Sequence, residues 1–219
     1  MIWVYAICER REPPPMRGLL GAPVDAIREG PLTAVLSHHD HLPTEFAHAA
    51  LWEHERVVEG AMQDCAVLPV RFGTEISEAA LRRTLAERQG ELLDALERVR
   101  GRVEVAVRAM PADRGPAAPP HDSGRDYLRG KLETRKRNAA AAAALRAPLT
   151  ALAVSARLGR GQGELCRDAY LVGRDVVPMF RRTVNRLRGE HRDARLVCTG
   201  PWPPYSFVAP RETSSSDAP

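Results

Sequence analysis

The sequence predicts an α+β protein of two domains: a modified ferredoxin-like amino-terminal domain (residues 1–100) and a split βαβ, ferredoxin-like carboxy-terminal domain (residues 101–209) with a long helix. The 219 residues, 44% of them hydrophobic, are enough for one large domain or two small ones. The second half orders its elements as strand, helix, strand, strand, helix, strand, as ferredoxin-like units do. The first half is a less regular version, and residues 210–219 are expected to be a disordered tail.

The second domain begins with an alternating strand, RVEVAVRAM, at residues 102–110. Its valines alternate with charged side chains, which is the pattern of a half-buried strand. A loop rich in proline, glycine and aspartate is predicted over residues 111–122. Ser123 then starts a capping-box-like sequence, and strong helix formers predict a long helix over residues 124–147, ended by Pro148.

The middle of this long helix, ETRKRN at residues 133–138, contains no apolar side chain. Such a segment is either a solvated overhang or a surface for a partner, and the sequence leaves both interpretations open. An alanine run follows it at residues 139–144.

Two strand-like runs come next, at residues 149–158 and 165–172, and the sequence GRGQG between them predicts a hairpin. Asp175 is expected to cap a second helix whose apolar side chains follow a helical period. Pro178 would lie in its first turn, where a missing N–H costs little. A last strand is predicted over residues 195–199.

The first domain starts with strands at residues 2–7 and 32–36, which are joined by a loop rich in proline and glycine. Thr44 is expected to cap a helix that ends near Met62. These elements give the first domain its first two strands and its first helix.

A short strand at residues 67–72 follows, and Pro69 places it at a sheet edge or a bulge. Ser77 is expected to cap one helix that continues to a stop at Gly101. Its apolar face consists of Leu81, Leu85, Leu92, Leu96 and Val99.

Charge and the amino terminus restrict the possible partners. The net charge is +4 and the pI about 9.1, but acidic residues alternate with the arginines along every predicted helix, as on solvated faces. RVEVAVRAM also lacks the aromatic side chains of an RNA-binding sheet, so no nucleic acid is expected. The start MIWVYAICERR is apolar first and charged second, the reverse of a secretory leader, and no membrane partner is expected.

The four cysteines are isolated, without a CxxC pair or a zinc spacing. They are interpreted as small core side chains in a reducing cytosol, with no disulfide. These residues are Cys8, Cys65, Cys166 and Cys198.

The run SHHDH at residues 37–41 is the most suggestive sequence for a metal site. Neighbouring side chains of an extended segment point in alternate directions, so these imidazoles do not easily converge on one ion, and no metal is expected. His54 lies on the apolar face of its predicted helix and is interpreted as a hydrogen-bonded core residue. Catalytic motifs are absent, and GRGQG lacks the lysine and hydroxyl of a phosphate loop, so we expect no enzyme and no cofactor.

Four stretches together resemble one family: the start IWVYAI, the segment LWEHERVVEGA, the block VLPVRFGTEISEAALRRTL with GRVEVAVRAM after it, and the ending TGPWPPYSFV. They are similar to the gas vesicle protein family GvpL/GvpF, in the family's order from residue 2 to residue 208. SGRDYL and DAYLV lie between them. The proline-rich first connection and the alanine run depart from the family pattern.

The resemblance implies an accessory, minor structural protein of gas vesicles, the hollow protein-walled organelles that give some prokaryotes buoyancy. It implies a non-enzyme of the gas vesicle or cytoplasm that contacts the small hydrophobic shell protein and other gas vesicle accessory proteins during early assembly. It leaves open whether the chain is GvpF-like or GvpL-like. The alternative function is a ferredoxin-like small-molecule-binding regulatory module, which a tightly bound metabolite in a thermal-shift screen would indicate.

Five residues are predicted to contact a protein partner. Arg71 and Phe72 adjoin the strand that Pro69 interrupts, where an edge would present backbone and side chains to an added strand. The other three, Trp202, Tyr205 and Phe207, belong to the ending GPWPPYSFV. This segment is interpreted as a clamp over the core of the second domain or as a partner contact.

Overall fold

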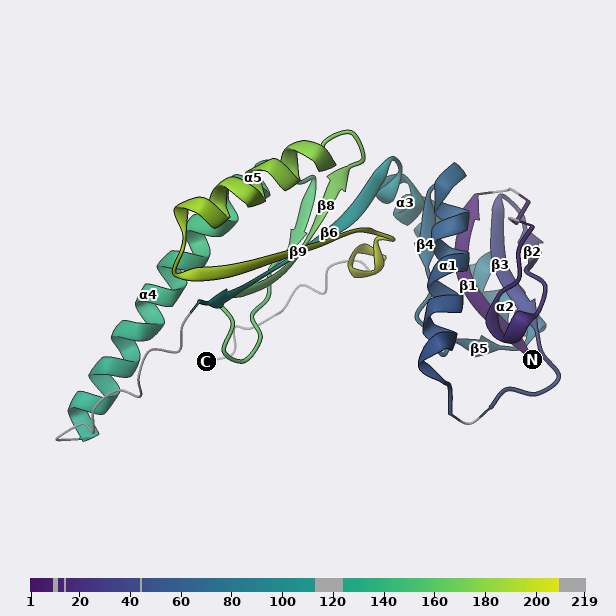
Figure 1. The fold of residues 1–219 in the computed structure, drawn as a ribbon. Coiled ribbons are helices and arrows are strands. Elements are labelled where there is room, and N and C mark those ends of the chain that lie inside the picture. The colour runs from purple at the N-terminus through teal and green to yellow at the C-terminus, as the bar shows by residue number, and fades with distance from the viewer. Residues whose placement is uncertain (10–11, 14, 44, 113–123, 209–219) are drawn as a thin grey trace. The chain divides into compact units, whose positions relative to one another are not determined.

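The computed structural model describes residues 1–9, 12–13, 15–43, 45–112 and 124–208, which form two compact units (Figure 1). Unit 1 contains Met1–Arg102 together with the segment that starts at Trp202, and unit 2 contains Val103–Pro201. Within the described ranges, no helix is both long enough and apolar enough to cross a membrane. Residues 113–122 of the loop expected over 111–122, the cap residues Thr44 and Ser123, and the expected tail lie outside the described residues, while Pro111 belongs to the strand before the loop.

Unit 1 is built on a five-stranded sheet with the order β2-β3-β1-β4, in which β5 also pairs with β1. Every one of these pairs is antiparallel, as in a ferredoxin-like sheet. In the described part of the first crossover (residues 12–13 and 15–24), a short 3-10 turn, η1 (Leu19–Gly21), stands where a ferredoxin-like unit has a helix. The strands are β1 (Ile2–Glu9), β2 (Asp25–Glu29), β3 (Leu32–His38), β4 (Val67–Pro69) and β5 (Glu75–Ile76).

The central strand β1 is buried on both faces because helices cover the sheet on both sides (Figure 1). The first is α1 (His48–Asp64), which begins with Ala47 at its N-cap position. The second side carries α2 (Glu78–Glu87) and α3 (Gln89–Val99). Pro69 lies in the edge strand β4 as expected, but this strand ends at Pro69 instead of residue 72. Strand β2 lies in the connection that the sequence predicts to be a loop, so that prediction is wrong.

The expectation of one helix from Ser77 to Gly101 is wrong. Ser77 does cap α2, since its Oγ accepts the Ala80 N–H at 3.3 Å, but the helix breaks at Arg88, where φ is −104° and ψ is 17°. The apolar stripe has polar residues at positions 88 and 89, and Gly90 is a poor helix former, so neither packing nor propensity keeps the helix continuous there.

Unit 2 has the predicted strand, helix, strand, strand, helix, strand order, and its sheet has the order β7-β8-β6-β9. Both helices cover one face of the sheet (Figure 1), where apolar side chains from both helices and the sheet form one core. The elements are β6 (Arg102–Pro111), α4 (Gly124–Thr150), β7 (Ser155–Arg157), β8 (Cys166–Gly173), α5 (Val177–Glu190) and β9 (Ala194–Trp202).

Two boundaries in unit 2 differ from the expectation. Helix α4 continues through Pro148 to Thr150, because Leu149 is buried in the core one turn after Leu145 and packing there outweighs the proline. The strand expected from residue 149 is therefore reduced to β7. Asp175 does not cap α5, whose N-cap residue is Val176 without a side-chain cap.

The expectation that the ending GPWPPYSFV covers the second domain is also wrong. From Trp202 onward the chain belongs to unit 1, with a 3-10 turn η2 at Tyr205–Phe207. Pro203 and Pro204 have no N–H to donate to a sheet, so they favour departure from β9. Phe207 is buried, and the Tyr205 hydroxyl donates a hydrogen bond to Glu55 of α1 at 2.8 Å.

Candidate functional site

Exposed apolar side chains occur around α1 in unit 1. Trp52 is 61% exposed and Leu51 is 38% exposed, both on α1. Leu20 in η1 is 56% exposed and Trp202 is 38% exposed. We call Leu20, Leu51, Trp52 and Tyr205 the α1 surface; Trp202 lies three residues before Tyr205, at the end of β9. Large exposed apolar groups that occur together, rather than singly, are typical of interaction sites.

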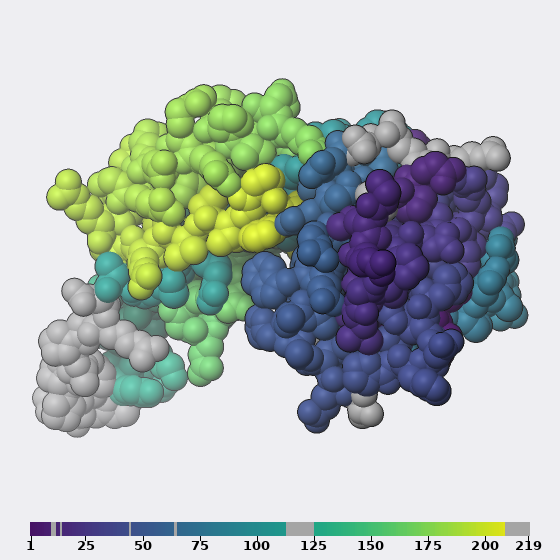
Figure 2. Space-filling view, turned by 45° about the vertical axis from the view of Figure 1, so that its right-hand side comes forward, coloured from purple at the N-terminus to yellow at the C-terminus, as the bar shows by residue number. Residues whose placement is uncertain are grey.

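The turn η1 is fixed against α1 and the sheet by backbone hydrogen bonds. The Leu19 N–H donates to the Tyr5 hydroxyl at 2.7 Å, and the Leu20 N–H donates to Glu53 Oε2 at 2.9 Å. Leu19 is buried, whereas Leu20 is held exposed with φ 53° and ψ 27°. Such a left-handed conformation costs a leucine about 1–2 kcal/mol, so the fold presents this side chain at an energetic cost. Figure 2 shows this part of the chain, in purple, beside α1, in blue.

The carboxy-terminal segment is fixed on α1 by Tyr205. Its hydroxyl donates to Glu55 Oε1 at 2.8 Å, in a half-buried environment. Burial raises the pKa of Glu55, an effect that the hydrogen bond from Tyr205 opposes. Burial and the neighbouring Glu55 both raise the pKa of Tyr205.

Trp52 lies between these two attachments. Successive residues of a helix are rotated by about 100°, so Glu53 lies to one side of Trp52 and Glu55, about 60° away, lies to the other. Glu53 holds η1 and Glu55 holds the carboxy-terminal segment. The exposed indole is therefore bordered by two segments from opposite ends of the chain.

The side chain of His54, on α1, packs in a cluster of aromatic rings. The cluster consists of Trp3, Tyr5, Phe46, His54 and Phe72. The Trp3 Nε1–H donates to His54 Nδ1 at 3.0 Å, which assigns the proton to Nε2. Nε2 then donates to the Val70 carbonyl at 3.0 Å. Burial lowers the pKa of His54 to about 4. The prediction of a hydrogen-bonded core histidine is confirmed.

Phe72 also belongs to this cluster. Its ring centroid lies 5.0 Å from that of Trp3 and 5.6 Å from that of His54, and its side chain is half-buried. Because β4 ends at Pro69, Phe72 and Arg71 follow the strand instead of extending it. Arg71 is exposed. A partner contact by these two residues stays a prediction.

The histidine run is directed to separate partners. His38 Nε2 lies 3.7 Å from Asp25 Oδ2, and His39 Nε2 lies 2.7 Å from Ser37 Oγ. Across the described ranges, no group of three or more histidine, cysteine, aspartate or glutamate residues is placed to hold a metal ion.

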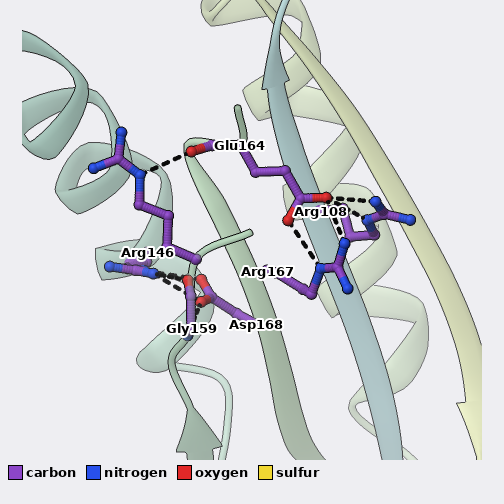
Figure 3. A network of polar contacts seen from close by, with 7 residues as sticks. Arg108, Arg146, Gly159, Glu164, Arg167 and Asp168 are labelled. Carbon is purple, nitrogen blue, oxygen red and sulfur yellow. Dashed lines mark hydrogen bonds and ion pairs between the residues drawn. The ribbon is translucent and has the colours of Figure 1, made fainter. Parts of the chain in front are cut away.

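Sequence reasoning missed a polar site in unit 2, where arginines surround the buried carboxylate of Glu164 (Figure 3). Glu164 Oε1 accepts from Arg108 Nε at 2.9 Å, and Oε2 accepts from Arg167 Nε at 2.9 Å. Arg160 Nε donates to the Glu164 backbone carbonyl at 2.9 Å. The hydrogen bonds from Arg167 and then from Arg108 lower the pKa of Glu164 to about 2. Only the glycine-rich sequence GRGQG signalled an unusual loop there.

Comparison with known proteins gives a consistent result. The sequence profile of the family described as gas vesicle synthesis protein GvpL/GvpF matches residues 1–209. The chain is 28% identical to gas vesicle protein L of a Streptomyces species, over 94% of this chain and 92% of that protein. It is 29% identical to gas vesicle protein F of the same source, over 94% and 98% of the two chains. Identity to gas vesicle protein F2 of Halobacterium salinarum is 27%, over 81% and 76%.

Two crystal structures share the fold. GvpF from an Anabaena species superposes with a TM-score of 0.82 and 17% identity, covering 96% of each chain. GvpF from Microcystis aeruginosa superposes with a TM-score of 0.79 and 17% identity, covering 95% of this chain and 98% of that one. At this identity the likeness supports the fold alone.

Proposed function

Because this chain belongs to the gas vesicle synthesis protein GvpL/GvpF family, we propose that it is a non-catalytic accessory protein of gas vesicles that binds the hydrophobic shell protein and assists vesicle assembly or nucleation. Its partners are the shell protein and other gas vesicle accessory proteins, and it acts at the gas vesicle in the cytoplasm. The α1 surface is the observation that carries this proposal.

The α1 surface suits an apolar partner. Trp52 is more than half exposed, and burying such an aromatic side chain on binding contributes about 2 kcal/mol. Tryptophan is also among the residues that most often dominate binding energy in interfaces. The two bordering segments are hydrogen-bonded to α1, so the surface is organised before a partner binds.

The helix surface is a better candidate than the edges of the sheet in unit 1. Charged side chains occupy the edge strand β2, where Arg28 pairs with Glu12, and Glu29 lies 3.4 Å from Arg82. The other edge, β4, has three residues, one of which is a proline. Charge, shortness and proline are the features by which edge strands avoid pairing with another chain. The shell protein is therefore expected to contact α1 and not to add a strand to this sheet.

Co-expression with the shell protein tests the proposal. The wild-type chain is expected to co-purify with the shell protein and to increase its soluble fraction. Trp52→Ala is expected to reduce the co-purified shell protein by about tenfold, because it removes the central apolar contact. Leu158→Ala is the matched control, since Leu158 is 53% exposed but lies in unit 2.

Two results would contradict the proposal. The first is a shell protein whose solubility does not change and which does not co-purify with the wild-type chain. The second is an equal loss of co-purified shell protein in Trp52→Ala and Leu158→Ala. That result would show that the shell protein does not bind at the α1 surface. Thermal unfolding of both variants shows whether the fold is intact.

A further inference from the structure

A cavity of about 480 Å³ in unit 2 is lined by the three arginines near Glu164. Arg108, Arg160 and Arg167 line it together with the polar residues Asn138 and Gln162. We call it the arginine pocket. Glu164 is itself only 4% exposed, whereas the side chains of Arg108 and Arg167 are 49% and 59% exposed. The carboxylate thus holds two guanidinium groups from the buried side while they remain accessible from the pocket.

The loop that carries the pocket requires its glycines. A Cβ atom on Gly161 would lie 2.1 Å from Glu164 Oε2, and one on Gly159 would lie 2.8 Å from the Arg167 carbonyl oxygen. Gly163 has φ +73°, which favours glycine. The GRGQG sequence is therefore explained by the close approach of the loop to the carboxylate and its arginines.

A second ion pair fixes the start of this loop (Figure 3). Arg146 donates to both oxygens of Asp168 at 2.9 Å, and its Nη2 donates to the Gly159 carbonyl at 2.7 Å. The Gly159 N–H donates to Asp168 Oδ1 at 2.9 Å. With both ends of the loop held, the guanidinium groups are placed before a ligand arrives, which lowers the entropic cost of binding one.

The charge of the pocket favours an anion. Three guanidinium groups face one carboxylate, so two positive charges are uncompensated within this group. A guanidinium has five N–H donors, and these arginines use at most two of them in the bonds above. Carboxylates and phosphates are the groups that such donors bind best.

The arginine pocket continues into the exposed part of α4. Asn138 lines the pocket, and the helix extends from there past the sheet (Figure 1). Residues 125–137 are exposed apart from half-buried Gly130, and they contain six basic and two acidic side chains. Their net charge of +4 equals that of the whole chain. We call this segment the α4 overhang.

The α4 overhang is amphipathic as well as basic. Leu128 is 65% exposed and Leu132, one turn later, is 52% exposed. Leucines one turn apart form an apolar stripe that a second amphipathic segment can cover. An overhang that contacted only solvent would not need this apolar stripe.

We propose that the arginine pocket and the α4 overhang together bind an acidic, amphipathic segment of a partner protein. A carboxylate of that segment enters the pocket, and its apolar side chains cover Leu128 and Leu132. The concave pocket does not match a flat anionic membrane, and the paired leucines are no platform for stacking bases. This surface is separate from the α1 surface and goes beyond the shell-binding proposal.

Fluorescence anisotropy with the full chain tests this assignment. The probe is a short labelled peptide in which glutamates alternate with leucines, and the comparison peptide carries glutamine in place of glutamate. We expect the glutamate peptide to bind at least about tenfold more tightly, with an affinity that falls as salt is added.

Variants locate the bound peptide. Arg160→Gln is expected to weaken binding by about tenfold, and it leaves Arg108 and Arg167 on Glu164. Arg135→Gln in the α4 overhang is expected to weaken it by about threefold. The matched control is Arg186→Gln on α5, which removes the same charge from a side chain that is 55% exposed and is expected to change nothing. Thermal unfolding confirms that each variant is folded.

Four outcomes would overturn the assignment. These are no binding of the glutamate peptide, equal binding of the glutamine peptide, an equal effect of Arg186→Gln and Arg160→Gln, and tighter binding of single-stranded DNA or phosphatidylserine vesicles than of the peptide. Trp52→Ala is expected to leave peptide binding unchanged, so failure here is distinguishable from failure of shell binding.

Discussion

At the scale of single residues, His54 shows how packing assigns a role to a titratable group. It adjoins an acidic neighbour in sequence, but its two nitrogens are occupied by the Trp3 indole and the Val70 carbonyl. The indole can only donate, so the imidazole is neutral in the folded protein. Periodicity alone predicted burial on the apolar face, and the tertiary contacts added the tautomer.

The stability of unit 1 should therefore depend on pH through His54. Its folded pKa is about 4 and its ordinary pKa is 6.5, so between these values the unfolded chain binds the additional proton. The free energy of unfolding is expected to fall as pH is lowered through this window, by up to about 1.4 kcal/mol per pH unit. Denaturation followed by tryptophan fluorescence measures this, because all three tryptophans lie in unit 1.

His54→Gln is the control for that pH dependence. Glutamine can accept from Trp3 and donate to Val70 but does not titrate. The variant should show a weaker pH dependence across the same window. An unchanged slope would assign the proton uptake to another group.

Leu20 has a strained, left-handed backbone conformation. Its side chain is exposed, so little burial energy within unit 1 compensates for this strain. Leu20→Gly is expected to raise the free energy of unfolding by about 0.5 kcal/mol, because relief of about 1–2 kcal/mol exceeds the added entropy cost of glycine. The same variant should weaken shell binding. Chemical denaturation checks the first effect and co-purification checks the second.

Leu20→Ala separates strain from side-chain loss. Alanine has a Cβ atom, so the left-handed conformation stays strained and no gain in stability is expected. Shell binding should again fall, because the leucine side chain is lost. A gain in stability for alanine would show that strain is not the cause.

At the scale of elements, the glycine-rich loop of unit 2 depends on an ionised Glu164. Its pKa is depressed from 4.5 to about 2, so its contribution to stability is present above about pH 4.5 and is lost as pH falls towards 2. Glu164→Gln should therefore be less stable than the wild type at pH 6, with the difference disappearing near pH 2. Circular dichroism of unfolding at several pH values measures it, and a pH-independent difference would contradict the ionic explanation.

Element boundaries followed from the sequence only where local signals and packing agreed. Ser77 starts α2 as expected, because a cap acts within its own turn. Pro148 does not end α4, because Leu149 is buried in the core of unit 2 and this long-range packing keeps the last turn helical. The break at Arg88 combines several weak preferences, and the leucine pattern on either side did not reveal it.

At the scale of the whole molecule, the buried Phe207 should stabilise unit 1 although it follows the last strand of unit 2. Phe207→Ala is expected to destabilise unit 1 by about 3 kcal/mol. Hydrogen exchange followed by mass spectrometry should then show faster exchange in α1 and β1.

Phe180→Ala is the matched control, since Phe180 is buried in the core of unit 2. Its effect should appear in β8 and α5. If Phe207→Ala accelerated hydrogen exchange only in unit 2, the ending GPWPPYSFV would have to be assigned to the second domain.

Local patterns in the sequence were enough to predict the family, the ferredoxin-like order of unit 2 and the alternating valines of β6. These features follow from motifs and from periods of two and 3.6 residues, which are local. Two contacts become visible only in the folded chain: Tyr205 donates to Glu55, 150 residues away, and the arginines at 108, 160 and 167 meet around Glu164. Such contacts depend on how distant elements pack, and no local period contains that information.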